Sequence, residues 1–171
     1  MRSAGYFTTS DRAVLQRAAH LAEGLTQRYF DLGHNLWRRN PYAMYTREEV
    51  GETLSHDDVF ANIVRIEAPR QKQTQVSAPP KYGIVLHDPN ILTALLRSCR
   101  HDLWTLGLFV LTHELIHIVR FREFSVDFFA SSAERDQEER VVYSMTREIL
   151  SGVTTIDDVL SLYDFPRGDV N

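Results

Sequence analysis

The sequence predicts an α+β domain in which long helices pack against a small antiparallel sheet. Three features support this fold class: a helical repeat of apolar residues near the N-terminus, two short β-type segments, and one helix-type segment that is apolar on almost every side. At 171 residues the chain fits a single domain, 1–171, and is long enough to bury a core without disulfides. Within it we expect an N-terminal helical part at 1–60 and the main core at 80–150.

The N-terminal part begins with the helical repeat. Its apolar residues recur at helical spacing over about 11–38, so we expect one helix there, with a break near Gly33. Residues 39–58 are polar and mixed, and a short helix near 47–54 is the only element that their pattern suggests.

Two segments carry the β-type pattern. FANIVRIE at 60–67 and YGIVLH at 82–87 are rich in β-branched and aromatic residues. Between them lies a polar stretch with three prolines at 68–81, which predicts a long hairpin loop. The two segments are therefore expected to form antiparallel strands.

Helices are expected to follow. Asp88-Pro89 is a suitable start for a helix to about residue 100, because Asp caps free amide groups and Pro suits the first helical position. The segment 103–119 is apolar on almost every side, which places it in the interior. Its polar residues favour a buried helix over a membrane span. Ser131 or Ser132 then caps a helix that Ser151-Gly152 ends, and a short final helix is expected at 155–162.

Composition narrows the class of protein. The net charge is −4, so neither a nucleic-acid partner nor a membrane partner is predicted. Cys99 is the only cysteine, which rules out an intrachain disulfide and a thiolate-rich zinc site. The first ten residues lack the apolar core of a signal peptide. A cytoplasmic location is the resulting expectation.

The chemistry concentrates in His113-Glu114-Leu115-Ile116-His117, an H-E-x-x-H pattern inside the buried helix. Residues four apart on an α-helix project from nearly the same face, so His113 and His117 can hold one ion. Glu114 lies about 100° away around the helix, where it misses the ion but can reach a metal-bound water as general base. The pattern predicts a catalytic site with one Zn²⁺ ion, within a zinc-binding core at 80–150.

Burial strengthens this prediction. Two imidazoles and a carboxylate placed in an apolar interior without partners would cost several kcal/mol. A metal ion removes that cost. The alternative is a pair of core histidines whose ring nitrogens bond to backbone or side-chain groups.

A third protein ligand must come from elsewhere in the chain. Glu123 stands where a longer H-x-x-G-x-x-H motif would place a ligand, but the turn residue of that motif is Arg120 here and not Gly. Glu138 shares a helix face with Val142, Met145 and Ile149, and Glu134 lies one turn earlier on the same side. We expect Glu138 as the ligand and Glu134 as its fallback, with Glu139 in solvent.

The pattern resembles the gluzincin branch of the zincin metallopeptidases. The stretch from Ser132 through Glu138 to Val142 is similar to the glutamate helix of membrane-associated gluzincins, and to that of small metallopeptidase-like domains in bacterial gene regulation. The resemblance implies a zincin-like fold, with His113, His117 and Glu138 as ligands and Glu114 as general base. Val141-Val142 departs from it, because these families carry Ala followed by Asp or Asn there. The group that would orient a ligand histidine is then missing, unless Glu134 replaces it.

The expected function is zinc-dependent hydrolysis of a peptide or protein substrate. In zincins an edge strand beside the zinc helix pairs with an extended substrate, and YGIVLH resembles that strand in chain order. Tyr143, His87 and Tyr82 are candidates for a transition-state donor or substrate contact. One rival is a regulatory or protein-binding module that keeps the metal without turnover, with a partner docking through 1–60. Another is a zinc-stabilised structural protein; Glu114 favours the enzyme over both.

Overall fold

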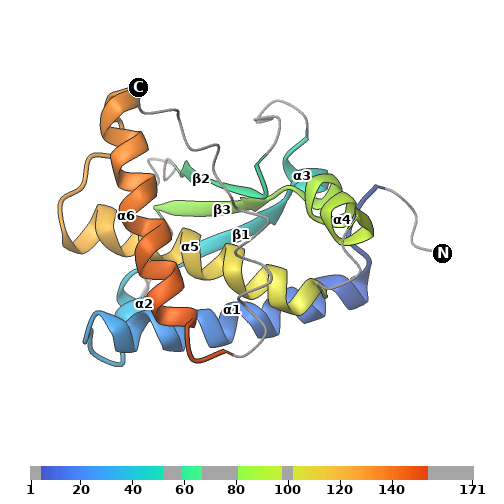
Figure 1. The fold of residues 1–171 in the computed structure, drawn as a ribbon, viewed down its shortest axis with the longest axis horizontal. Coiled ribbons are helices and arrows are strands. Elements are labelled where there is room, and N and C mark those ends of the chain that lie inside the picture. Colours follow the sequence, from blue (N-terminus) through green and yellow to red (C-terminus); the bar gives the residue numbers. More distant parts are fainter. Residues whose placement is uncertain (1–4, 52–58, 67–80, 98–101, 154–171) are drawn as a thin grey trace, which may run out of the picture.

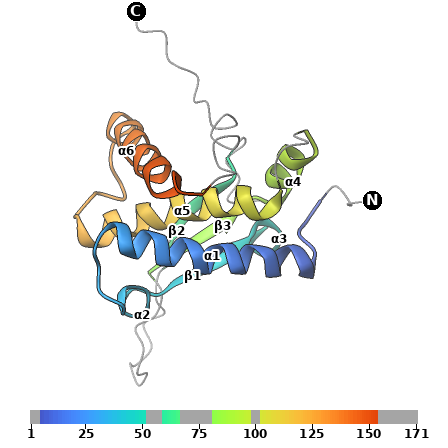
Figure 2. The ribbon, with the colours of Figure 1, turned by 60° about the horizontal axis from the view of Figure 1, so that its bottom comes forward.

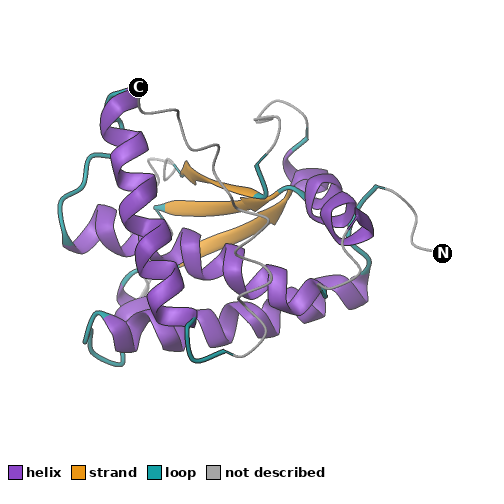
Figure 3. Ribbon diagram, in the orientation of Figure 1, coloured by secondary structure: helices purple, strands orange, loops and turns teal. Residues whose placement is uncertain are grey.

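The protein has a mixed α and β fold. The computed structural model describes residues 5–51, 59–66, 81–97 and 102–153, and these contain six helices and a three-stranded sheet (Figures 1 and 3). In chain order the elements are α1 (Thr9–Tyr29), α2 (Leu36–Arg39), β1 (Tyr42–Thr46), α3 (Arg47–Val50), β2 (Ala61–Arg65), β3 (Tyr82–Leu86), α4 (Asp88–Arg97), α5 (Leu103–Glu123) and α6 (Ser132–Leu150). The α+β prediction is confirmed. The helix expected at 155–162 and nearly all of the loop at 68–81 lie outside the described residues.

The sheet is mixed and not antiparallel as predicted. Its strand order is β1-β3-β2, with β3 parallel to β1 and antiparallel to β2. The hairpin-like pairing of β2 with β3 is confirmed. The error came from β1, which lies in the stretch where no strand was expected. Its partner on β3 is about 40 residues away (Tyr42 pairs with Tyr82), so no local pattern announces the pairing.

The YGIVLH segment is the central strand and not an edge. All five residues of β3 are buried, as expected for a strand that is paired on both sides and covered on both faces. A substrate cannot add to it, which corrects the expectation. Within the described part of the chain the free edges belong to β1 and β2, and β2 is the edge strand in contact with α5.

Helix α1 lies along α5 and forms the largest helix contact of the core (Figure 2). Leu15, Ala18 and Ala22 are buried against it. On α5 the close approach depends on Gly107, because a Cβ atom there would come within 2.6 Å of Leu15 Cδ2. The absence of a side chain at Gly107 therefore sets how near the two helices lie.

The first helix is shorter than expected. It starts with a capping box, in which Thr8 Oγ1 accepts from the Asp11 backbone N–H and the Asp11 carboxylate accepts from Thr8 N–H. It ends at Tyr29, and Asp31 then has a φ of 51°, a left-handed conformation that no helix continues. The predicted break is thus confirmed, slightly before Gly33, and α2 is a separate short helix.

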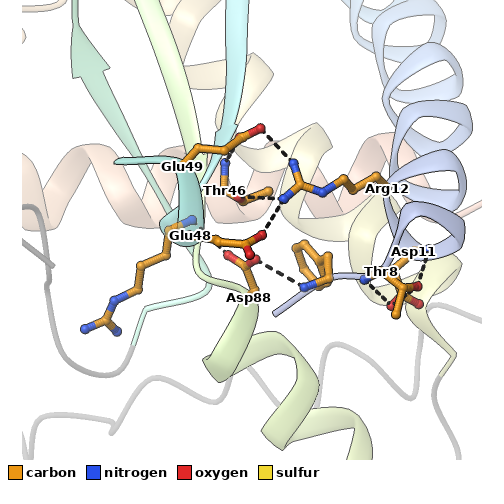
Figure 4. Close-up of polar contacts among 9 residues, drawn as sticks. Thr8, Asp11, Arg12, Thr46, Glu48, Glu49 and Asp88 are labelled. Atoms are coloured by element: carbon orange, nitrogen blue, oxygen red, sulfur yellow. Dashed lines mark hydrogen bonds and ion pairs between the residues drawn. The ribbon is translucent and has the colours of Figure 1, made fainter. Parts of the chain in front are cut away.

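A polar cluster joins the starts of three helices (Figure 4). The buried carboxylate of Asp88, at the start of α4, accepts from the backbone N–H of Phe7 at 3.3 Å and from that of the first residue of α3 at 2.8 Å. Arg12 on α1 forms ion pairs with Glu48 and Glu49 on α3, both at 2.7 Å. These contacts anchor the N-terminal arm to the carboxyl end of β3.

Helix α5 forms the centre of the molecule. Its N-terminus is capped by Asp102, whose side chain accepts from Thr105 N–H at 2.7 Å, and every residue from 105 to 119 is buried. Among the described helices it is the one long and apolar enough to cross a membrane by length and composition. However, 89% of its most apolar window is buried inside the protein, as in the core helix of a soluble fold. Helix α6 packs across its second half (Figure 1).

Candidate metal centre

Two imidazoles of α5 point toward α6. His113 and His117 are each only 5% exposed, and their Nε2 atoms lie 3.3 Å apart. Each ring also stacks on a phenyl ring one helical turn away, His113 on Phe109 and His117 on Phe121. The stripe Phe109, His113, His117, Phe121 repeats every four residues, so it follows one face of the helix.

The third member of the group is Glu139 on α6. Its Oε2 lies 3.1 Å from His113 Nε2, and its Oε1 lies 3.1 Å from His117 Nε2. One donor atom from each of the three residues lies within 4.8 Å of the others, a spacing that could hold a metal ion. The Glu139 side chain is 41% exposed while both imidazoles are buried, so the group opens to solvent along α6.

The spacing of these atoms fits a small divalent ion. Zinc binds imidazole nitrogen and carboxylate oxygen at about 2.0–2.2 Å, and two such ligands on a tetrahedral ion lie roughly 3.3 Å apart. The observed separations are 3.3 Å between the nitrogens and 3.1 Å from each nitrogen to Glu139. Three protein ligands leave a fourth position open, as catalytic zinc sites do.

Glu138, the expected ligand, has a different environment. Arg120 on α5 binds its carboxylate with two hydrogen bonds, Nε to Oε1 at 2.5 Å and Nη2 to Oε2 at 2.8 Å. The nearest imidazole atom, His117 Nδ1, is 4.0 Å away and belongs to the side of the ring opposite Nε2. Glu138 therefore lies behind the ligand group. Glu139 is partly exposed to solvent, as expected, but its carboxylate also meets both imidazoles, which was not expected.

The burial of α6 explains this difference. Its fully buried residues are Val142, Thr146 and Leu150, and Glu139 lies on that same stripe at the i−3 position from Val142. The expected inward face ran through Val142, Met145 and Ile149. The observed face shares Val142 with it but is rotated around the helix axis toward Thr146 and Leu150. Thr146 was the signal that sequence reasoning missed, because it is polar and yet it lies on the stripe facing α5.

The other two candidate ligands lie elsewhere. Glu134 is an exposed capping residue at the start of α6, where it accepts from the Ser131 hydroxyl at 2.6 Å and from the Ser131 backbone N–H. Glu123 is the last residue of α5, and its Oε1 accepts from the Asn40 side-chain amide at 3.0 Å. Neither belongs to the group formed by the two imidazoles.

Each imidazole also has a group near its second nitrogen. Thr146 Oγ1 lies 3.5 Å from His113 Nδ1, and the Thr146 hydroxyl donates to the Val142 carbonyl at 2.7 Å. Its oxygen can therefore accept from Nδ1–H, and the unprotonated nitrogen that a cation requires is then Nε2, the atom that faces Glu139. The resemblance placed the missing orienting group at Val142. Thr146, which can take that role, lies one helical turn after it. For His117, the nearby carboxylate is that of Glu138, which Arg120 holds 4.0 Å from Nδ1, and Nδ1 has no hydrogen-bond partner within the described residues.

Glu114 is buried beside the group. Desolvation raises its pKa to about 7; the charge of His113 lowers it and that of Glu139 raises it, with smaller effects. A carboxyl group that titrates near neutral pH suits a general base. Glu139 behaves in the opposite way. Burial favours its neutral form, but the hydrogen bonds and charges of His113 and His117 outweigh this and hold the pKa of Glu139 far below its usual range.

The three predicted substrate contacts are not gathered at this group. Tyr82 starts β3, and its ring packs on Phe121, one turn beyond His117. His87 follows the opposite end of β3, where its Nε2 lies 2.6 Å from Asn62 Oδ1. Tyr143 packs edge-on against Phe109. Tyr82 and Tyr143 are thus each separated from an imidazole of the group by a single ring, which is Phe121 for Tyr82 and Phe109 for Tyr143.

Comparison of the chain with family models, curated proteins and solved structures found no match. The chemistry of the site itself therefore carries the functional argument.

Proposed function

We propose that the protein is a zinc-dependent hydrolase of gluzincin type, acting on peptide bonds, with His113, His117 and Glu139 as the metal ligands. The observation that carries this proposal is the convergence of three ligand atoms beside a buried carboxylate, Glu114. Glu139 takes the role that the resemblance gives to Glu138, and the zincin-like fold is part of the same proposal.

The donor set favours Zn²⁺ among the common metals. Two imidazoles and one carboxylate are a frequent catalytic zinc set, whereas Mg²⁺ and Ca²⁺ prefer oxygen ligands alone. When bound, the ion would supply a Lewis acid and lower the pKa of a coordinated water.

Glu114 is assigned the role of general base. It follows His113 directly, so it projects about 100° away from the ligand stripe and stays outside the ligand set. With a pKa of about 7 its carboxylate is charged in a large fraction of molecules at neutral pH, and it can accept the proton of an attacking water. A site that only stabilises structure has no use for such a base.

A peptide substrate is favoured by the free edge of β2. This strand contacts α5, and its outer edge has no partner strand among the described residues. An extended peptide can add to such an edge through backbone hydrogen bonds. In this proposal the substrate therefore pairs with β2 and not with YGIVLH, the strand first expected to bind it.

The decisive experiment compares Glu114→Gln with the wild type. Hydrolysis of a mixed peptide library should fall by about 10²–10⁴-fold in the variant, because the base is lost while the ligands remain. Zinc content after purification should stay at one ion per chain in both proteins. Glu123→Gln is the matched control on the same helix, since a Gln side chain can still accept from Asn40.

Equal hydrolysis by wild type and Glu114→Gln would reject the enzyme. Full zinc occupancy without turnover of any peptide would instead favour the metal-retaining binding module. A protein that takes up no zinc would remove both.

A further inference from the structure

Four aromatic rings pack together at one end of the metal centre. Tyr82, Phe121, Phe128 and Phe129 form this aromatic cluster, with ring centroids 5.1–5.8 Å apart between neighbours. They come from the start of β3, the end of α5 and the loop between α5 and α6. Three distant parts of the chain therefore supply one continuous aromatic surface.

The aromatic cluster begins at a metal ligand and ends in solvent. The His117 ring stacks on Phe121 with a centroid distance of 5.7 Å and an interplanar angle of 21°. At the other end Phe129 is 70% exposed. A single exposed apolar residue is ordinary, but here the exposed ring continues a packed series of rings that leads to the ligand group.

Two guanidinium groups flank the aromatic cluster. Arg65 lies over the Phe129 ring at 5.6 Å, and Arg122 lies over the Tyr82 ring at 5.3 Å. Arg122 Nη1 donates to Asn40, while its Nε and Nη2 are buried and have no hydrogen-bond partner within the described residues. Neither guanidinium forms an ion pair with a carboxylate of the described residues. The rim of the cluster is therefore cationic, which complements an anionic group.

A peptide paired with the edge of the sheet would direct some of its side chains to this surface. Arg65 pairs across the strands with Tyr82, so both side chains leave the same face of the sheet, and Ile63 on that face packs into the core. A peptide paired with the free edge of β2 would place every second side chain on that face. One of these side chains would then lie beside Arg65 and Phe129.

We propose that the aromatic cluster is the side-chain site of the proposed hydrolase, and that it selects peptides with an aromatic residue two positions from an acidic one, because residues i and i+2 of an extended peptide lie on the same face. The aromatic side chain packs on Phe129 and Phe128, and the carboxylate pairs with Arg65. This inference rests on the proposed function for its link to hydrolysis. The binding preference itself is a separate property and is tested separately.

The test measures binding to the Glu114→Gln protein loaded with zinc, which should not turn the peptide over. Three fluorescein-labelled peptides of one host sequence carry Phe-Ser-Glu, Ala-Ser-Glu or Phe-Ser-Gln, and fluorescence polarisation gives their Kd values. The Phe-Ser-Glu peptide should bind about tenfold more tightly than the Ala-Ser-Glu peptide, as burial of a phenyl ring predicts. It should bind several-fold more tightly than the Phe-Ser-Gln peptide.

Two further substitutions locate the site. Phe129→Ala should abolish the preference for Phe over Ala, and Arg65→Gln should abolish the preference for Glu over Gln. Phe124→Ala is the matched control, because Phe124 is a 51% exposed ring in the same loop that packs on Phe30 and not on the aromatic cluster. It should leave all three Kd values unchanged.

Equal binding of the three peptides, or no binding of any at millimolar concentration, overturns this inference. So does a preference that survives Phe129→Ala or is lost equally in Phe124→Ala. Selective binding together with a wild type that never hydrolyses the Phe-Ser-Glu peptide would keep the side-chain site and reject the proposed function, so the two failures are distinguishable.

Discussion

Helix α5 makes two interfaces that differ in kind. One face of α5 packs on α1 through small and aliphatic side chains, with Leu15 against Gly107. The second half of α5 faces α6 through imidazoles, carboxylates and a guanidinium. The first interface is apolar and closely packed, whereas the second is polar and its charges surround the candidate metal centre.

The contrast indicates that the two interfaces of α5 are stabilised in different ways. The α1–α5 interface gains its stability from apolar burial, which needs no ligand. At the α5–α6 interface, groups that could hold a cation lie together, so the stability of this interface should rise if an ion binds. Three sets of substitutions test whether the two interfaces are independent.

The largest effect is expected from Leu15→Ala at the apolar interface. Leu15 is 1% exposed, and truncation of a buried leucine costs about 2–5 kcal/mol in the free energy of unfolding. Zinc affinity should stay within about twofold of the wild type, because the substitution lies apart from the ligands. Urea unfolding and chelator competition measure the two quantities. A matching loss of zinc affinity would show that the interfaces are coupled.

A double-mutant cycle with Gly107→Ala sharpens this prediction. Alone, the added Cβ would meet Leu15 Cδ2 at 2.6 Å, and overpacking of this kind costs about 1–3 kcal/mol. In the Leu15→Ala background the obstacle is gone, so the second substitution should cost much less. Strictly additive effects on unfolding would argue against the close approach of the two helices.

The next largest effect separates the two adjacent glutamates of α6. Glu139→Gln should weaken zinc binding by about 100-fold or more, equivalent to about 2.7 kcal/mol, because a ligand loses its charge. Glu138→Gln should weaken it by about tenfold or less, since Glu138 pairs with Arg120 and its carboxylate lies 4.0 Å from His117 Nδ1. Titration with a competing chelator gives both values. The opposite order would restore Glu138 as the ligand.

The smallest effect is expected behind His113. Thr146→Val removes the hydroxyl near Nδ1 with little change in shape, and zinc affinity should fall by about tenfold. Thr112→Val is the matched control: Thr112 is buried on the same helix as His113, and its Oγ1 has no hydrogen-bond partner within the described residues. It should leave zinc affinity unchanged and unfolding free energy equal or slightly higher. Equal losses of zinc affinity in the two variants would show that Thr146 does not orient His113.

Much of the local structure follows from nearest neighbours along the chain. Asp102 and Ser131 cap the two helices that carry the ligands, as Asp and Ser do elsewhere. The H-E-x-x-H spacing places two imidazoles on one face by helix geometry alone. These features were predictable because each depends on residues no more than four positions apart.

The choice between Glu138 and Glu139 could not be made in this way. The two residues differ by about 100° around α6, so a small rotation of that helix on α5 exchanges their roles. Arg120 settles the choice, because it takes Glu138 into an ion pair and leaves Glu139 to the imidazoles. That contact joins residues 18 positions apart on two helices.

The sequence by itself determined the α+β class, the central buried helix and the pair of histidines, since these depend on composition, periodicity and local spacing. Only the tertiary structure decided which strand is an edge, which glutamate meets the histidines and how the aromatic cluster is assembled. Each of these depends on how distant segments pack, and packing geometry sums many weak contacts that no short stretch of sequence contains.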